Sequence, residues 1–78
     1  MSQDNIPKLF RQRIQEAKEQ QLEVLDLSDG QLTQIPDEVF ELTHLKKLDL
    51  SYNKIQHIPS QISRLTNLES LGVVPRYV

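Results

Sequence analysis

The chain has 78 residues, which allows one domain at most, because a domain takes roughly 150 residues. Hydrophobic residues make up 37% of the sequence and aromatic residues 5%, so we expect a small aliphatic core without a deep active site. Nine basic and eleven acidic residues give a net charge of −2, whereas nucleic-acid-binding domains usually carry a basic stripe. The composition therefore excludes a multidomain enzyme and argues against a nucleic-acid partner.

The sequence contains no cysteine, which excludes a disulfide framework and a thiolate metal site. Its first residues show no basic segment followed by an apolar stretch, so no signal peptide is predicted. The apolar runs are only a few residues long, far short of the ~20 residues that span a bilayer. We therefore expect a soluble, cytoplasmic protein without a membrane partner.

Residues 6–20 are predicted to form an amphipathic helix. Apolar residues recur there at the spacing of one helix face: Ile6, Phe10, Ile14 and Ala17. Pro7 is expected in the first helical turn, where proline is tolerated. Because a stack of repeats has an open apolar end that needs a cap, we predict that residues 1–21 form an N-terminal capping helix.

From residue 22 onward, apolar residues recur at a step of 23 residues. The positions related by this step include Leu22, Leu45 and Leu68; Leu25, Leu48 and Leu71; Leu27, Leu50 and Val73; and Leu32, Ile55 and Val78. Residues 45–55 also match the pattern L-x-x-L-x-L-x-x-N/C-x-L, which has a period of about 20–29 residues. The sequence therefore predicts two complete repeats, 22–44 and 45–67, and an incomplete one, 68–78.

Each repeat is predicted to begin with a short strand of a parallel sheet. Alternate side chains of a strand face opposite sides, so Leu48 and Leu50 point inward, and Lys47, Asp49 and Ser51 point outward. The leucines of one repeat bury only part of their surface, and stacking of neighbouring repeats completes the core.

Asn53 is the expected turn residue after the second strand. Its amide is predicted to bond backbone groups of the turn and of a neighbouring coil. Gly30 and Arg76 occupy the equivalent positions of the other two repeats, so no ladder of asparagines forms, and we expect less regular stacking at both ends.

The segments 35–42 and 58–65 are predicted to return the chain from one strand to the next. Their apolar residues are spaced i, i+3, which favours a short α-helix or a 3₁₀ turn, and Pro36 and Pro59 suit its start. The predicted fold class is α/β: a short solenoid with three parallel strands and an N-terminal capping helix.

The outward strand positions face the concave side, which solenoids use for partners. These positions are Val24, Asp26, Ser28, Asp29, Lys47, Asp49, Ser51, Tyr52, Ser70, Gly72 and Val74. From them we select four partner-binding candidates: Asp26, Lys47, Asp49 and Tyr52. Tyr52 is either an aromatic anchor or a turn residue that half-covers the adjacent coil. The strands alone offer on the order of 100 Å², against roughly 800 Å² per partner in a standard interface, which is too little for tight recognition.

Phe40 is a second candidate for a contact residue, because Ser63 stands at its equivalent position. The favoured interpretation is that Phe40 packs against its own coil. The basic pair Lys46 and Lys47 is expected to be neutralised across the strands by Asp49 and Glu69, which gives a charge-balanced face.

The sequence predicts no catalytic, cofactor-binding or metal-binding residues. His44 and His57 lack a third ligand at metal-binding spacing, so both are expected to be solvated surface residues. Residues 26–30 lack the acidic spacing of a calcium loop. Ser28, Asp29 and His44 are the residue types of a hydrolase triad, but no strained nucleophile turn accompanies them. We therefore expect no enzyme activity.

The third repeat stops at Val78, without a return segment or a C-terminal cap. Because stable arrays usually need three or more repeats, we expect either a fragment of a longer solenoid or end-to-end self-association through this uncapped repeat. Pro75, Arg76 and Tyr77 are residues of the kind that blunts an exposed edge.

Two motifs carry a family resemblance. L-x-x-L-D-L-S at 22–28 and 45–51, and I-P-x-x-ϕ-x-x-L-T at 35–43 and 58–66, resemble the intracellular leucine-rich repeat family. The helix containing Arg13-Ile14-x-x-Ala17, followed by Leu-Asp-Leu-Ser, is similar to the entry of the repeat region in Roco-type GTPases and related bacterial leucine-rich repeat proteins.

The resemblance implies a protein-interaction or regulatory region, and GTPase activity does not carry over because the sequence has no GTP-binding motif. Our first functional hypothesis is a non-catalytic protein–protein interaction module. The alternative is an N-terminal regulatory or scaffold fragment of a larger leucine-rich repeat protein, such as a Roco-like GTPase.

Overall fold

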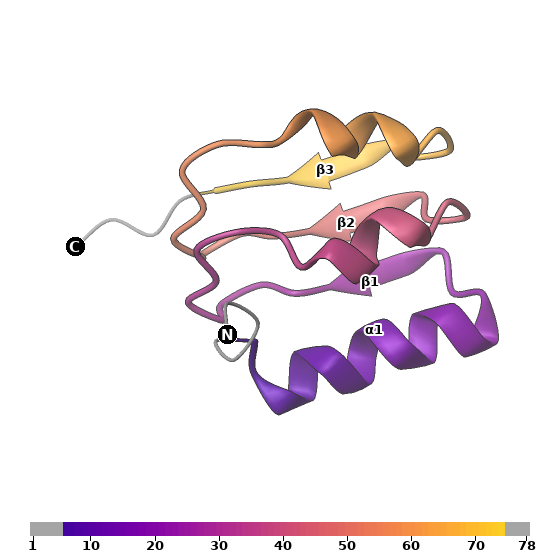
Figure 1. Ribbon diagram of the computed structural model, residues 1–78, viewed down its shortest axis with the longest axis horizontal. Coiled ribbons are helices and arrows are strands. Elements are labelled where there is room, and N and C mark those ends of the chain that lie inside the picture. Colours follow the sequence, from indigo (N-terminus) through magenta and orange to yellow (C-terminus); the bar gives the residue numbers. More distant parts are fainter. Residues whose placement is uncertain (1–5, 75–78) are drawn as a thin grey trace.

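The computed structural model describes residues 6–74, in which one α-helix precedes a three-stranded sheet (Figure 1). The elements are α1 (Lys8–Gln20), β1 (Val24–Asp26), η2 (Asp37–Glu41), β2 (Lys47–Asp49), η3 (Ser60–Arg64) and β3 (Ser70–Gly72). Figure 1 shows α1 running beside β1 at one edge of the sheet, and the 3₁₀ helices η2 and η3 lying in the segments that connect successive strands.

The sheet is parallel, with the strand order β1-β2-β3. Leu25 pairs with Leu48, and Leu48 pairs with Leu71, so each strand is displaced from the next by 23 residues. The predicted register and the three predicted parallel strands are therefore confirmed. The return segments form 3₁₀ helices, one of the two predicted forms, and Pro36 and Pro59 stand directly before them.

The hydrophobic core lies between the sheet and the return segments, and it extends through the first two repeats. Leu45, Leu48 and Leu50 are at most 2% exposed. Phe40 is also buried in the core cluster, so it is not an exposed contact residue; that it packs against its own coil stays a prediction. Leu71 differs from its register partners because it is 38% exposed, since β3 is the outermost strand of the described sheet.

Helix α1 contributes its predicted apolar face to the core, because Phe10, Ile14 and Ala17 are all at most 4% exposed. The helix begins at Lys8 rather than at residue 6. Pro7 has extended backbone angles and stands just before the helix, where its carbonyl accepts hydrogen bonds from the N–H groups of Phe10 and Arg11. The prediction that Pro7 lies within the first turn was therefore wrong by one position.

Gly30 explains why the first repeat lacks the turn asparagine. A Cβ atom at Gly30 would lie 2.0 Å from Cε2 of Phe10. The ring of Phe10, a residue of α1, therefore occupies the space that a side chain at position 30 would need. The departure from the repeat pattern is thus the consequence of packing a helix against the first coil.

Asn53 joins the first two coils, as predicted, and it is only 2% exposed. Its Oδ1 accepts hydrogen bonds from the N–H groups of Gly30 and Leu32, both at 2.9 Å. Its Nδ2 donates to the carbonyl oxygens of Leu27 and Leu50, at 2.8 and 3.0 Å. One side chain therefore satisfies backbone groups of two adjacent turns. Residues 75–78, including the predicted edge residues Pro75, Arg76 and Tyr77, lie outside the described part of the chain.

Candidate functional site

The exposed face of the sheet carries side chains in rows that run across the strands, because equivalent residues are in register. The first row is Val24, Lys47 and Ser70; the second is Asp26, Asp49 and Gly72. Three of the four predicted binding residues, Asp26, Lys47 and Asp49, therefore lie on adjacent strands. All three are exposed.

A hollow of about 350 Å³ opens over these rows. Its lining consists of Val24, Asp26, Lys47, Leu48, Asp49, Ser51, Ser70 and Gly72. A Cβ atom at Gly72 would lie 3.2 Å from Oδ1 of Asp49 and 3.3 Å from Oγ of Ser51. The missing side chain of Gly72 therefore helps to leave this space open.

Asp26 is held by the turn that follows β1. Its Oδ1 accepts hydrogen bonds from the hydroxyl of Ser28 at 2.6 Å and from the N–H of Ser28 at 2.9 Å. These two bonds lower the pKa of Asp26 below its ordinary value; partial burial opposes them, and the positive charge of Arg13 adds a smaller lowering effect. Asp26 therefore stays ionised at neutral pH.

Asp49 accepts fewer hydrogen bonds than its register partner Asp26. Its Oδ1 accepts the N–H of Ser51 at 3.0 Å, which reproduces one of the two bonds in the first repeat. The hydroxyl of Ser51 makes no hydrogen bond with any residue in the described range 6–74, although Ser51 is only 9% exposed. The second repeat thus places a carboxylate and a hydroxyl, both with remaining hydrogen-bonding capacity, beside the same hollow.

Tyr52 lies just after β2 and does not line the hollow. It is 50% exposed, and its φ of 60° places it in the left-handed region, as does the φ of 58° at the equivalent Asp29. Tyr52 is therefore a turn residue with a half-exposed ring, and its role as an aromatic anchor stays a prediction.

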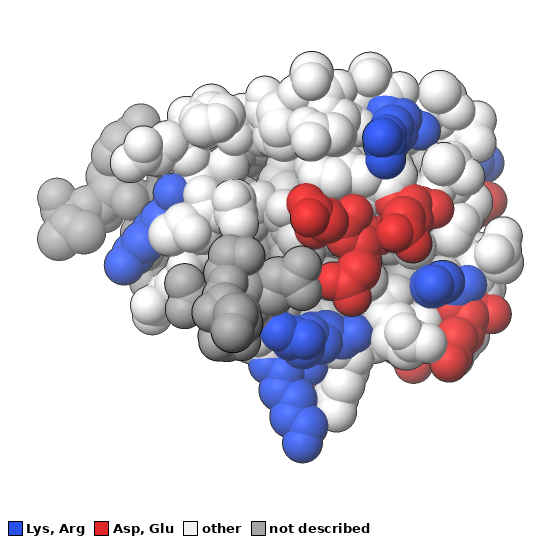
Figure 2. All heavy atoms as spheres, viewed as in Figure 1, with Lys and Arg blue, Asp and Glu red and all other residues white. Residues whose placement is uncertain are grey.

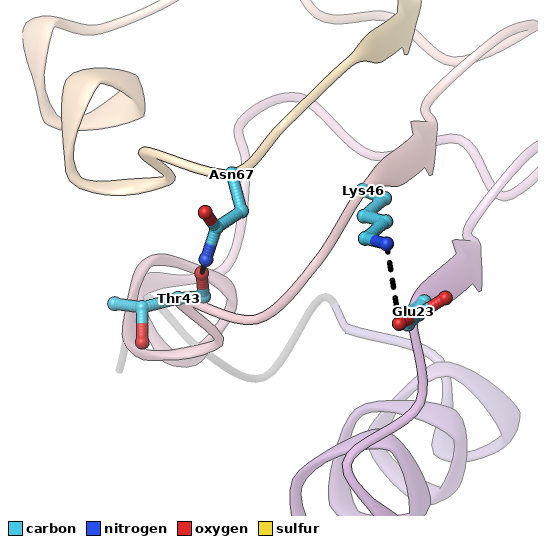
Figure 3. Close-up of polar contacts among 4 residues, drawn as sticks. All are labelled: Glu23, Thr43, Lys46 and Asn67. Atoms are coloured by element: carbon cyan, nitrogen blue, oxygen red, sulfur yellow. Dashed lines mark hydrogen bonds and ion pairs between the residues drawn. The ribbon is translucent and has the colours of Figure 1, made fainter.

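Lys46, the first residue of the basic pair, has an acidic partner that differs from the prediction. Nζ of Lys46 lies 3.5 Å from Oε2 of Glu23, in the preceding repeat, rather than pairing with Glu69 or Asp49 (Figure 3). Glu23 and Glu69 are both one repeat away from Lys46, so spacing alone did not decide between them. A pair this exposed adds little stability, about 0–1 kcal/mol.

A second link between repeats lies on the same side, before the strands. Nδ2 of Asn67 donates to the carbonyl oxygen of Thr43 at 3.0 Å (Figure 3). This bond links the segment before β3 to the segment before β2. The pair between Lys46 and Glu23 likewise links the segment before β2 to the segment before β1.

His44 has a structural contact that its solvated-surface assignment did not foresee. It is half-buried, and its Nε2 lies 3.1 Å from the carbonyl oxygen of Ala17, near the end of α1. Since a carbonyl oxygen only accepts, this contact requires the hydrogen on Nε2. His44 therefore ties the end of the first repeat to α1, whereas His57 is exposed as predicted.

The residue types of a hydrolase triad are not assembled into one. The hydroxyl of Ser28 donates to Asp26, and His44 contacts the backbone of Ala17. Within residues 6–74, no group of three or more histidine, cysteine or acidic side chains is placed to hold a metal ion. In the same range, no helix has the length and apolar character needed to cross a bilayer.

Another charged feature lies over η2. Figure 2 shows acidic atoms gathered where Figure 1 places this 3₁₀ helix, with basic atoms over α1 and η3 around them. The exposed acidic residues of η2 are Asp37, Glu38 and Glu41. Because these acidic side chains do not line the hollow, substitutions of them can serve as controls for substitutions of Asp26 and Asp49.

Sequence reasoning selected the charged lining residues but missed Ser51 and Gly72 as contributors to the site. Both stood among the outward positions, but neither residue type signals binding by itself. The signal was the difference between repeats: a glycine at the register position of Asp26 and Asp49.

Residues 20–74 match a family model described as leucine rich repeat, and this range holds all three strands and both 3₁₀ helices. No curated protein gave a significant match. Leucine-rich repeats are commonly protein-interaction modules and are typically non-enzymatic. Since the match covers most of the sequence and the strands pair at the 23-residue step, this chain belongs to the leucine-rich repeat family.

Proposed function

We propose that the protein is a non-catalytic protein-interaction module, built as a short leucine-rich repeat solenoid in a cytoplasmic protein. In this proposal residues 1–21 form the N-terminal cap, and residues 22–44, 45–67 and 68–78 form the repeats. The observation that carries the proposal is the hollow on the exposed sheet face, where adjacent rigid strands hold Asp26, Lys47 and Asp49.

Apolar side chains around the charged rows support a protein partner rather than a small ion. Val24 is 56% exposed, and Tyr52 and Val74 are each 50% exposed. Protein interfaces combine apolar contacts with hydrogen bonds, and aromatic residues are enriched at their energetic centres. The face thus offers both kinds of contact.

The size of the face limits the affinity. Three short strands supply on the order of 100 Å², against roughly 800 Å² per partner in a standard interface. A partner must therefore also contact the turns after the strands, where Tyr52 lies, and we expect binding at the weak, transient end of the range.

The test compares two double variants with the same charge change. Tyr52→Ala/Lys47→Glu alters the exposed sheet face, and Gln61→Ala/Arg64→Glu alters exposed residues of η3. Proteins retained by the immobilised wild-type chain should be lost with the first variant and kept with the second. Identical sets of retained proteins would remove Tyr52 and Lys47 from the proposed interface.

The alternative proposal is a structural role, either as an N-terminal regulatory or scaffold segment of a larger protein such as a Roco-like GTPase, or through end-to-end self-association. It is favoured by Leu71, a core-register leucine that is 38% exposed on the outermost described strand. Light scattering of the 78-residue chain and of Leu71→Lys tests end-to-end self-association, which is supported by a concentration-dependent dimer that the variant abolishes.

An in-frame continuation of repeats in the gene would support the role as a segment of a larger protein.

A further inference from the structure

The turn after β1 contains a chemically labile pair of residues. Asp29 is followed by Gly30, and it is the one aspartate of the sequence whose next residue is glycine. The backbone nitrogen after an aspartate attacks the side-chain carboxyl carbon most readily when it belongs to glycine, which has no Cβ atom to crowd it and the greatest backbone freedom. Every other aspartate and asparagine of the chain precedes a bulkier residue. The sequence thus favours this attack most at Asp29.

Packing, rather than backbone geometry, requires glycine at position 30. The φ angle of Gly30 lies outside the left-handed region, whereas that of Asp29 is 58°. A Cβ atom at Gly30 would lie 2.0 Å from Cε2 of Phe10. Aspartate is one of the few residues besides glycine that tolerate the left-handed conformation. The fold therefore favours both members of the labile pair.

The nitrogen that would attack is held by the second coil. The N–H of Gly30 donates to Oδ1 of Asn53 at 2.9 Å, and Asn53 is only 2% exposed. On either side of it, the N–H of Asp29 donates to the carbonyl oxygen of Ser51 and the N–H of Leu32 donates to Oδ1 of Asn53, both at 2.9 Å. An amide nitrogen must give up its hydrogen to act as a nucleophile, and here a buried acceptor binds that hydrogen. The folded chain therefore withholds the attacking atom.

The carboxyl group of the pair, in contrast, is accessible to water. Asp29 is exposed, and it lines an open hollow of about 470 Å³ together with Pro7, Gly30, Gln31 and Thr33. Water is also the one co-reactant that the rearrangement needs. Opening of the turn, rather than access of a reactant, is thus the step that the structure controls.

We propose that Asp29 is a site of isoaspartate formation, and that the hydrogen bond from Gly30 to Asn53 restrains this reaction in the folded chain. The nitrogen of Gly30 forms a bond to Cγ of Asp29, and its hydrogen departs with the carboxyl hydroxyl group as one molecule of water. The product is a cyclic succinimide. A second water molecule then breaks one of the two bonds between the ring nitrogen and a carbonyl carbon. Cleavage of the bond to Cγ restores aspartate, and cleavage of the bond to the backbone carbon of Asp29 gives isoaspartate. The overall reaction is an isomerisation, without oxidation or reduction.

Isoaspartate at this position would alter the joint between the first two coils. The chain would then run from Cα of residue 29 through Cβ and Cγ to the nitrogen of Gly30, which lengthens the backbone by one methylene group. Gly30 is fixed between the ring of Phe10 and the side chain of Asn53, so the longer link displaces its N–H from Oδ1 of Asn53. We therefore expect faster amide exchange at Gly30 and Leu32 in the isomerised chain. This inference is independent of the proposed interaction function.

The experiment follows the whole chain during incubation at mildly acidic pH, with and without enough urea to unfold it. Mass spectrometry with electron-transfer fragmentation of a protease digest quantifies isoaspartate at position 29, because the two isomers give different backbone fragments. We expect conversion to be at least about tenfold slower in the folded chain, since the buried bond of Gly30 must break first. Amide exchange at Gly30 should be slowed by a similar factor under the same conditions.

Two variants and a matched control test the residues involved. Asp29→Glu should give no isomer even in urea, because its longer side chain forms the larger ring much less readily. Asn53→Ala removes the acceptor and should convert at least about tenfold faster than the wild type. Asn67→Ala makes the same change at an exposed asparagine and should convert like the wild type. Circular dichroism shows whether each variant is folded, and if Asn53→Ala is not, the comparison of wild type with and without urea decides.

Absence of isoaspartate at position 29 from the unfolded chain would overturn the assignment of this site. Conversion of the folded chain as fast as, or faster than, that of the unfolded chain would overturn the protective role of the hydrogen bond. A folded Asn53→Ala variant that converts at the same rate as Asn67→Ala would also overturn that role.

Discussion

The two edges of the sheet place equivalent leucines in different environments. Leu25 on β1 is 2% exposed because α1 packs beside that strand, whereas Leu71 on β3 is 38% exposed. Leu48, between them, is 2% exposed. The 23-residue register thus decides which way a leucine points, but a neighbouring element decides whether it is buried.

The largest expected effect on stability comes from truncation of Leu48, which lies between Leu25 and Leu71. Leu48→Ala should lower the free energy of unfolding by about 2–5 kcal/mol, as for other fully buried leucines. In so small a domain this should abolish the cooperative transition in a urea titration followed by circular dichroism. A variant that unfolds like the wild type would contradict the core assignment.

Asn53→Ala should have the next largest effect on stability, because Asn53 joins the two well-packed coils. It leaves the N–H groups of Gly30 and Leu32 without their acceptor, and each buried, unpaired group costs about 1–3 kcal/mol. Hydrogen exchange should show faster exchange at these two amides. Asn67→Ala, which removes an exposed bond to Thr43, serves as the control and should change stability by no more than about 0.5 kcal/mol.

Gly30→Ala tests the packing between α1 and the first coil. The new methyl group would overlap the ring of Phe10, and overpacking of this kind costs about 1–3 kcal/mol. Combined with Phe10→Leu in a double-mutant cycle, the two changes should be less than additive, since the smaller side chain makes room. Additive losses would show that the ring does not restrict Gly30.

Leu71→Ala makes the same truncation as Leu48→Ala at the open edge. Because Leu71 keeps more than a third of its surface exposed, the loss should be smaller, about 1 kcal/mol, at roughly 0.8 kcal/mol per buried methylene. Thermal unfolding of both variants under the same conditions gives the ratio. Losses of equal size would mean that β3 is covered in solution.

The smallest effect concerns pH. The pKa of Asp26 is lowered in the folded state, chiefly by the hydrogen bonds from Ser28, so its contribution to stability is present above the ordinary value of 3.8 and is lost as the pH falls through the lower folded value. Asp26→Asn should therefore lose less stability on acidification than the wild type does. Asp37→Asn, in η2, is the charge control; an equal change in both variants would argue against this linkage.

Much of the fold followed from the sequence because stacking imposes a repeat on the apolar residues. The spacing of Leu25, Leu48 and Leu71 predicted both the strands and their pairing, and Asn53 was recognised from the pattern it completes. What the spacing could not supply was contact between different kinds of element. The ring of Phe10 against Gly30 and the bond of His44 to α1 depend on where the helix packs, and no periodicity records that.

The candidate site was predicted in part for a similar reason. The alternation of the strands placed Asp26, Lys47 and Asp49 on the exposed face, but the hollow depends on Gly72, a residue that acts through the side chain it lacks. The sequence also could not predict that Lys46 pairs with Glu23 rather than with Glu69, since both stand one repeat away.

The position of α1 also sets a direction for assembly. The helix lies along β1, and Arg13 donates to the carbonyl oxygen of Asp26 on that side, so within residues 6–74 β3 is the strand whose outer edge no described element covers. Molecules that met edge to edge would use that one side of each and close as a two-fold pair, because head-to-tail fibres need two complementary free edges. In such an assembly, a helix that buries a few leucines would also favour a closed pair over an open-ended fibre.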